Sequence, residues 1–146
     1  MKIKPYDDTK YDEIYSLWMS CKNMGFNNVD DSREGIRRLV RKNPHTCYVA
    51  EEDGRIVGTV LAGNDGRRGY VYHLCVSEEH RRKGIAKALM DAMLEGMREE
   101  GISKVALVVF AYNDAANAFY DHIGFAKRND LFYRNIALRE LERIDT

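Results

Sequence analysis

The spacing of hydrophobic residues changes within the stretch from Tyr70 to Gly101. Tyr70 to Val76 is a β-rich run, whereas the apolar residues from Ile85 to Met97 recur at the 3.6-residue period of one helix face. The polar, basic segment Ser77 to Lys83 separates the two patterns. The stretch therefore predicts a strand, a turn and an amphipathic helix that begins at Gly84.

The chain before this stretch predicts two helices and an antiparallel meander. Asp31 and Glu34 form a capping-box pattern ahead of the second helix, and Asp53-Gly54 is typical of a hairpin turn. The strand at Tyr70 to Val76 completes the meander. In chain order we predict a strand at Lys2–Tyr6, a helix capped by Asp7, Asp8 or Thr9 and ending near Cys21, a turn-rich loop at Asn23–Asp30, a helix closed by Pro44, and strands at Thr46–Glu51 and Arg55–Ala62.

The chain after the central helix predicts a parallel strand and a shorter helix. Lys104 to Phe110 is the most continuously apolar β run, so the helix before it forms a right-handed crossover from the central strand. Asn113 or Asp114 caps the next helix, which Gly124 ends. Strands at Phe125–Lys127 and Phe132–Leu138 and a charged tail at Glu140–Thr146 follow. The predicted order is β-α-α-β-β-β-α-β-α-β-β, an α/β (α+β) fold in a single domain, residues 1–146.

Composition and charge narrow the class of protein. The chain is 45% hydrophobic, and its 23 Lys and Arg residues balance 23 Asp and Glu residues, so no global field favours a nucleic-acid or membrane partner. Cys21, Cys47 and Cys75 show no C-x-x-C spacing, which argues for a reducing compartment and against a disulfide framework or zinc site. With no basic-then-apolar leader at the N-terminus, we expect a cytoplasmic protein.

The basic turn before the central helix is a candidate anion site. A helix N-terminus exposes unpaired N–H groups at the positive end of its dipole, and Gly84 lets an anion approach the backbone. Arg81, Arg82 and Lys83 add positive charge, and Ala86 keeps the first turn small. The candidate ligand is a pyrophosphate, although such a turn also occurs as an ordinary solvated connection. Neither a P-loop nor a G-x-G-x-x-G fingerprint is present.

Two motifs within this order resemble the GNAT superfamily of N-acetyltransferases. R-x-x-G-x-A follows the third meander strand, and N-x-x-A-x-x-x-Y-x-x-x-G-F lies further along the chain. The residues that match are Arg81, Gly84, Ala86, Asn113, Ala116, Tyr120, Gly124 and Phe125. The resemblance covers nearly the whole chain and is strongest to small bacterial members similar to ribosomal-protein alanine acetyltransferases. It implies a GNAT-like mixed central sheet whose splayed parallel strands form the cofactor cleft, and it implies no metal.

The resemblance assigns residues to acetyl-coenzyme A. Its pantetheine arm would bond to the backbone of Leu74, Cys75 and Val76, and Asn113 would either bond to that arm or only cap its own helix. The pyrophosphate would lie on backbone amides beside the basic turn. The residues implied there are Arg81, Arg82, Lys83, Gly84, Ile85, Ala86 and Lys87.

The resemblance also implies direct acetyl transfer to an amine. Tyr120 matches the general acid that protonates the leaving sulfur, although it could be only a core aromatic residue. The oxyanion donor would be the N–H of Cys75 or Val76. The base is open between His73, Tyr72 and water relayed to Glu51 or Asp30, because Tyr72 and His73 alternate across the strand.

The acceptor is expected to be a small-molecule amine or a protein amine, bound by Met24 to Asp31 and Trp18. Phe26 could be a lid over the substrate or a plug for the core, and Asp30 could attract a cation, whereas Asp31 is explained as a helix cap. One alternative is a non-catalytic acyl-coenzyme A binding or sensing domain. Nucleic-acid binding is disfavoured by the neutral net charge. The resemblance is compatible with a homodimer.

Overall fold

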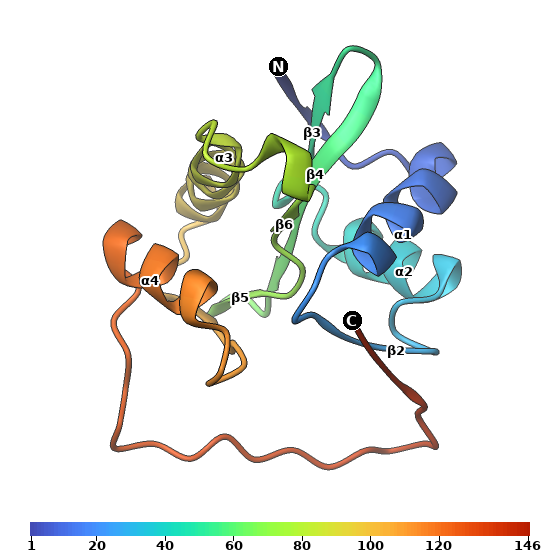
Figure 1. Ribbon diagram of the computed structural model, residues 1–146. Helices are drawn as coiled ribbons and strands as arrows, with labels where there is room; N and C mark the ends of the chain where they lie inside the picture. Colours follow the sequence, from blue (N-terminus) through green and yellow to red (C-terminus); the bar gives the residue numbers. More distant parts are fainter.

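Six strands form the central sheet of the computed structural model, which describes residues 1–146 (Figure 1). The sheet order is β1-β3-β4-β5-β7, and β6 also pairs with β4. All pairs are antiparallel except β5 with β7, so the predicted meander and parallel crossover are confirmed. The strands are β1 (Lys2–Pro5), β3 (Cys47–Glu52), β4 (Arg55–Asn64), β5 (Gly69–Val71), β6 (Cys75–Val76) and β7 (Val105–Leu107).

Helices cover both faces of the sheet, and each pair encloses its own hydrophobic core (Figure 1). The helices are α1 (Tyr11–Ser20), α2 (Arg33–Lys42), α3 (Ile85–Glu99) and α4 (Asp114–Ile123). Strand β4 contributes Ile56 and Leu61 to the core beside α1 and α2, and Val57 and Val60 to the core beside α3. A strand with both faces buried carries apolar residues without alternation, which explains why this run was recognised in the sequence.

Two predictions about the connection between α1 and α2 were wrong. Ser32 caps α2, since its Oγ accepts from Gly35 N–H at 3.1 Å, and Asp31 is not the cap. The loop also contains a strand, β2 (Gly25–Asn27), which pairs with β8 (Arg143–Asp145) in the predicted charged tail. Each of these short strands forms its hydrogen bonds with a segment at the other end of the chain, so the local sequence of neither shows a strand pattern.

The predicted strands near the C-terminus are the main departure from expectation. Phe125–Lys127 and Phe132–Leu138 pair with nothing, and the chain runs extended from α4 to β8 (Figure 1). The predicted strand at Lys104–Phe110 is ordered as a strand only over β7, with its outer edge unpaired. A β-rich sequence forms a strand only where a neighbouring strand accepts its hydrogen bonds, and this chain offers none there.

Candidate active site

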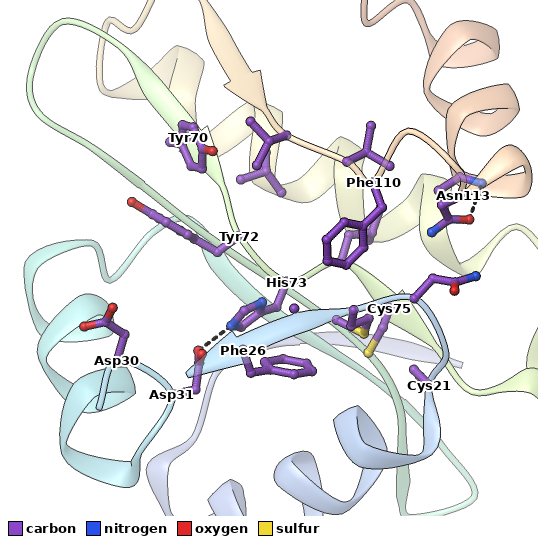
Figure 2. A pocket seen from close by; sticks show the side chains of 18 of the residues that line it. Cys21, Phe26, Asp30, Asp31, Tyr70, Tyr72, His73, Cys75, Phe110 and Asn113 are labelled. Carbon is purple, nitrogen blue, oxygen red and sulfur yellow. Dashed lines mark hydrogen bonds and ion pairs between the residues drawn. The ribbon is translucent and has the colours of Figure 1, made fainter. Parts of the chain in front are cut away.

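A β-bulge divides the predicted central strand into β5 and β6. Leu61 of β4 donates its N–H to the carbonyl of His73 (3.3 Å) and accepts from the N–H of Tyr72 (2.8 Å). Leu61 alone therefore lies opposite two residues of the neighbouring strand. A bulge bends its strand away from the flat ladder. Pairing of β5 with β7 ends at Val71 and Leu107, and a cleft of about 1290 Å³ opens beyond that point (Figure 2).

Backbone N–H groups line this cleft where β6 lies without a neighbour. Ser77 donates to Val57 at 2.8 Å and Cys75 pairs with Thr59, so both face β4. Because ladder hydrogen bonds alternate along a strand, Leu74 and Val76 present their N–H groups to the opposite side. Of the two amides expected to hold an oxyanion, the geometry therefore favours Val76 over Cys75.

The Cys75 thiol lines the same part of the cleft. Contact with Cys21 and burial hold its pKa well above the ordinary range, so it stays a neutral thiol.

The turn before α3 leaves a run of backbone donors without partners. None of the N–H groups from Arg82 to Lys87 has a hydrogen-bond acceptor in the protein. Arg82 (φ 64°) and Gly84 (φ 77°) adopt left-handed conformations, which turn successive N–H groups toward one side and make an anion-binding concavity. An added Cβ on Gly84 would meet nothing within 4 Å, so the space above the turn is open. The donor set fits a pyrophosphate.

Tyr120 on α4 lines the cleft across from β6. Its ring packs edge-on against Phe119 and Phe125, and its hydroxyl has no hydrogen-bond partner in the protein. Burial, followed by the nearby Cys75 thiol, raises the pKa of Tyr120 to about 12. The phenol is therefore fully protonated at neutral pH and has a free O–H to donate.

A buried His73–Asp31 pair lies on the other side of the cleft. The Nε2 of His73 lies 2.5 Å from Asp31 Oδ1, and the two side chains are 9% and 7% exposed (Figure 2). Asp31 Oδ2 accepts from the Asn27 N–H at 2.8 Å. An added Cβ on Gly35 would lie 2.3 Å from the Asp30 carbonyl, so glycine there lets α2 press against the Asp30–Asp31 turn.

The aromatic packing holds the His73 ring in place. Trp18 and Phe26 contact it with ring centroids at 4.9 Å and 4.6 Å. Its Nδ1 has no partner in the protein and stays accessible from the cleft. With Nε2–H donated to the Asp31 carboxylate, the neutral ring carries its lone pair on Nδ1. The arrangement is that of a general base with an oriented tautomer.

The residues expected to contact the acceptor or to act as its base differ in their access to the cleft. Trp18 is fully buried and does not line the cleft, whereas Phe26 is 5% exposed, belongs to the hydrophobic core and also lines the cleft. Tyr72 is 54% exposed and its ring contacts that of Tyr70 at a tilt of 48°. Partial burial, followed by the charge of Asp30, raises the pKa of Tyr72, which disfavours it as a base. Glu51 binds Lys4 at 2.9 Å, outside the cleft.

The remaining predicted residues keep their expected elements. Asn113 caps α4 through its Oδ1, which accepts from Ala116 N–H at 3.2 Å, and it lines the cleft. Asp30 also lines the cleft and accepts from Asn27 Nδ2 at 2.9 Å. No group of His, Cys, Asp and Glu side chains is placed to hold a metal ion. None of the helices combines the length and apolarity needed to cross a membrane.

Asp31 is the functional candidate that sequence reasoning missed. The neighbouring Ser32 caps α2 by accepting from the N–H of Gly35, so the Asp31 carboxylate is not needed as a cap for that helix. The presence of two adjacent residues that can each cap a helix was the one signal in the sequence, since the partner His73 is 42 residues away.

Known proteins are similar to this chain in sequence and in fold. The model of the Acetyltransferase (GNAT) family matches residues 11–125. Acetyltransferase SG1711 of Sodalis glossinidius (strain morsitans) is 30% identical over 131 residues, covering 90% of this chain and 91% of the relative. Ard1 from Thermoplasma volcanium superposes with a TM-score of 0.75 at 26% identity, covering 84% of this chain and 80% of Ard1.

The fold is also that of a ribosomal-protein-alanine N-acetyltransferase from Brucella melitensis biovar Abortus 2308. Its structure superposes with a TM-score of 0.68 at 24% identity, covering 92% of this chain and 98% of that one. The family match spans the anion-binding turn, the bulged strand and α4 together. The chain therefore belongs to the GNAT family of acetyltransferases and is an acetyl-coenzyme A dependent N-acetyltransferase.

Proposed function

We propose that this enzyme transfers acetyl to a primary amine of a small molecule or protein by direct attack, with His73 as base and Tyr120 as acid. The observation that carries this proposal is that one cleft holds a proton acceptor and a proton donor on opposite sides of the β6 backbone. Asp31 is a positioning residue, since it acts through His73.

Each group has a separate task in this reaction. Acetyl-coenzyme A supplies an acetyl thioester whose leaving group is a thiolate. His73 Nδ1 takes a proton from the acceptor ammonium, and the Asp31 carboxylate stabilises the resulting imidazolium. The N–H of Val76 donates to the oxyanion of the tetrahedral intermediate. Tyr120 gives its phenolic proton to the departing sulfur, and the second proton lost by the attacking nitrogen returns through solvent to restore the phenol.

A non-catalytic acyl-coenzyme A sensing domain, the alternative considered from the sequence, supplies the contrasting outcome for the test of this proposal. It needs the anion-binding turn but neither the His73–Asp31 pair nor the free Tyr120 hydroxyl. Incubation of the protein with acetyl-coenzyme A and a panel of amines and peptides separates the two. Release of coenzyme A that depends on the amine supports the enzyme, whereas tight binding without release of coenzyme A supports the sensor.

The turn before α3 is expected to govern affinity for the cofactor alone. Gly84→Asp places a carboxylate beside the unpaired N–H groups, so the KM for acetyl-coenzyme A should rise about 10- to 100-fold, the equivalent of one lost charge-assisted hydrogen bond. Gly84→Asn is the matched control, because asparagine tolerates φ > 0 equally well and adds no charge. Steady-state kinetics with each substrate varied makes the comparison. Equal KM values for acetyl-coenzyme A in the two variants would show that the pyrophosphate does not bind at this turn.

The acceptor end of the cleft carries free positive charge. Arg38 and Lys42 line it from α2, one helical turn apart, and neither makes an ion pair. Asp31 is paired with His73, and Asp145 lies 2.7 Å from Arg143. Asp30 is therefore the one carboxylate on this wall that makes no ion pair. We therefore propose that the acceptor carries an anionic group in addition to its amine.

Charge reversal on α2 tests the preference of the acceptor site. Arg38→Glu should raise the KM for a peptide with an acidic residue about tenfold, and should lower it for the matched peptide with lysine at that position. Arg41→Glu is the control, because Arg41 is an unpaired cation of the same helix that does not line the cleft. Identical peptide preferences in the two variants would show that α2 does not read acceptor charge.

A further inference from the structure

Two cysteine thiols lie together on the wall of the cleft, and the proposed reaction uses neither of them. Cys21 follows the last residue of α1 and Cys75 begins β6. Both line the cleft and are 4% and 7% exposed (Figure 2). The Cys75 thiol donates to the Cys21 sulfur, which also lies 3.8 Å from the Val76 carbonyl. The fold thus brings two free thiols into contact where small molecules can reach them.

The Cys21 thiol is the more reactive member of this pair. Contact with the Cys75 thiol lowers the pKa of Cys21 below its ordinary value, and the charge of Arg81 acts in the same direction against the opposing effect of burial. Cys75 stays a neutral thiol, as described above. Oxidants react with the thiolate form of cysteine, so Cys21 is the first site of attack. Cys75 then lies in place to react with the oxidised sulfur of Cys21.

Cys47 shows the contrasting behaviour of a core thiol. It is fully buried, does not line the cleft, and lies with its Sγ 3.4 Å from the Ala62 carbonyl. Burial raises the pKa of Cys47 to about 11, so this thiol is protonated at neutral pH. The chain therefore holds one reactive pair of cysteines and one inert cysteine that serves as an internal reference.

We propose that a peroxide converts Cys21 and Cys75 into a reversible disulfide and that this disulfide slows acetyl transfer, the second part of which rests on the proposed function. The Cys21 thiolate attacks one oxygen of hydrogen peroxide, which breaks the O–O bond and gives a sulfenic acid and hydroxide. The Cys75 sulfur then attacks the sulfenic sulfur. The S–O bond breaks, the departing hydroxide takes the Cys75 proton, and a disulfide and water form. The peroxide gains the two electrons that the two sulfurs lose.

The disulfide acts on the strand that carries the oxyanion donor. Val76 follows Cys75 in β6, and this short strand is held to β4 only by the pairs Gly58–Val76 and Thr59–Cys75. A covalent bond draws two sulfurs closer than contacting thiols can lie, so Cys75 and the adjacent Val76 N–H move toward α1. A misplacement of about 1 Å in a reacting site costs about 100-fold in rate. Oxidation should therefore lower kcat by about this factor.

Peptide mapping by mass spectrometry tests the thiol pair without relying on activity. The full-length protein is treated with a small excess of hydrogen peroxide and digested under non-reducing conditions. We expect a cross-linked pair of peptides that contain Cys21 and Cys75, which dithiothreitol separates, while Cys47 stays reduced. Absence of this cross-link, or a cross-link that involves Cys47, overturns the proposal.

The kinetics of the same samples test the effect on turnover. Peroxide should lower kcat about 100-fold in the parent and in the control Cys47→Ser, and dithiothreitol should restore it. Methionine sulfoxide needs dedicated reductases, so recovery with dithiothreitol identifies the disulfide. Cys21→Ser should keep its own untreated kcat within about twofold, since it cannot form the cross-link.

Two kinetic outcomes overturn the inhibitory effect of the disulfide: a mapped Cys21–Cys75 cross-link with unchanged kcat, and an equal loss of kcat in Cys21→Ser. An untreated parent that is inactive toward every amine instead rejects the proposed function. In that case the peptide map alone decides whether the two thiols form a disulfide.

Discussion

Tyr120→Phe is expected to lower kcat by about 100- to 10,000-fold, the range for a lost general acid, while leaving the KM for acetyl-coenzyme A nearly unchanged. The substitution removes only the hydroxyl, which has no protein partner to lose, and keeps the ring contacts with Phe119 and Phe125. Without the phenolic proton the sulfur departs as a thiolate that solvent must protonate. The loss therefore falls on the chemical step.

Tyr72→Phe is the matched control for this experiment. It also removes one phenolic hydroxyl from the cleft lining, but from an exposed side chain whose ring contacts Tyr70. Its kcat should stay within about twofold of the parent, since surface changes away from the chemistry are usually small. Unchanged turnover in Tyr120→Phe would make Tyr120 a packing residue and assign the proton to solvent.

The raised pKa of Tyr120 also predicts the shape of the pH profile. A general acid works only in its protonated form, and burial raises the pKa of this phenol to about 12. Activity should therefore show no alkaline decline from Tyr120 below about pH 11, one unit below that value, where about 90% of the phenol is protonated. A decline centred near pH 10 that disappears in Tyr120→Phe would contradict the buried position of the hydroxyl.

His73→Gln is expected to reduce kcat/KM for the amine by about 100- to 10,000-fold, the span typical of a lost general base. Glutamine retains polar atoms of similar reach but cannot accept a proton at neutral pH. Asp31→Asn should cause a smaller loss, because the base remains while the carboxylate that orients its ring and stabilises its charged form is gone. Asp30→Asn, the adjacent exposed carboxylate, is the control.

The split between kcat and KM distinguishes a catalytic His73 from a merely structural one. A lost base lowers kcat in His73→Gln and leaves the KM for acetyl-coenzyme A nearly unchanged, whereas a structural loss changes both constants. A His73→Gln variant with full activity would transfer the role to water near Asp30. Equal effects of Asp31→Asn and Asp30→Asn on kcat/KM would show that Asp31 does not orient His73 for catalysis.

The sequence alone predicted most elements through α4, with β2 as the exception, for physical reasons that act locally. Helix α3 follows from a 3.6-residue apolar period, the β3–β4 hairpin from Asp53-Gly54, and the ends of α4 from Asn113 and Gly124. Each signal lies within a few residues of the structure it specifies. The unpaired N–H groups of the turn before α3 were predictable for the same reason, because they and Gly84 belong to one continuous segment.

Only the tertiary structure decided which residues meet at the cleft and which segments pair with the sheet. Asp31 reads as a helix cap until His73 is brought within 2.5 Å of it, and the sequence does not show that Trp18 and His73 pack against the ring of Phe26. Phe125–Lys127 and Phe132–Leu138 read as two strands, yet neither pairs with another strand. Pairings of this kind join residues far apart along the chain, and their energies depend on which surfaces the fold brings together, so no local pattern records them.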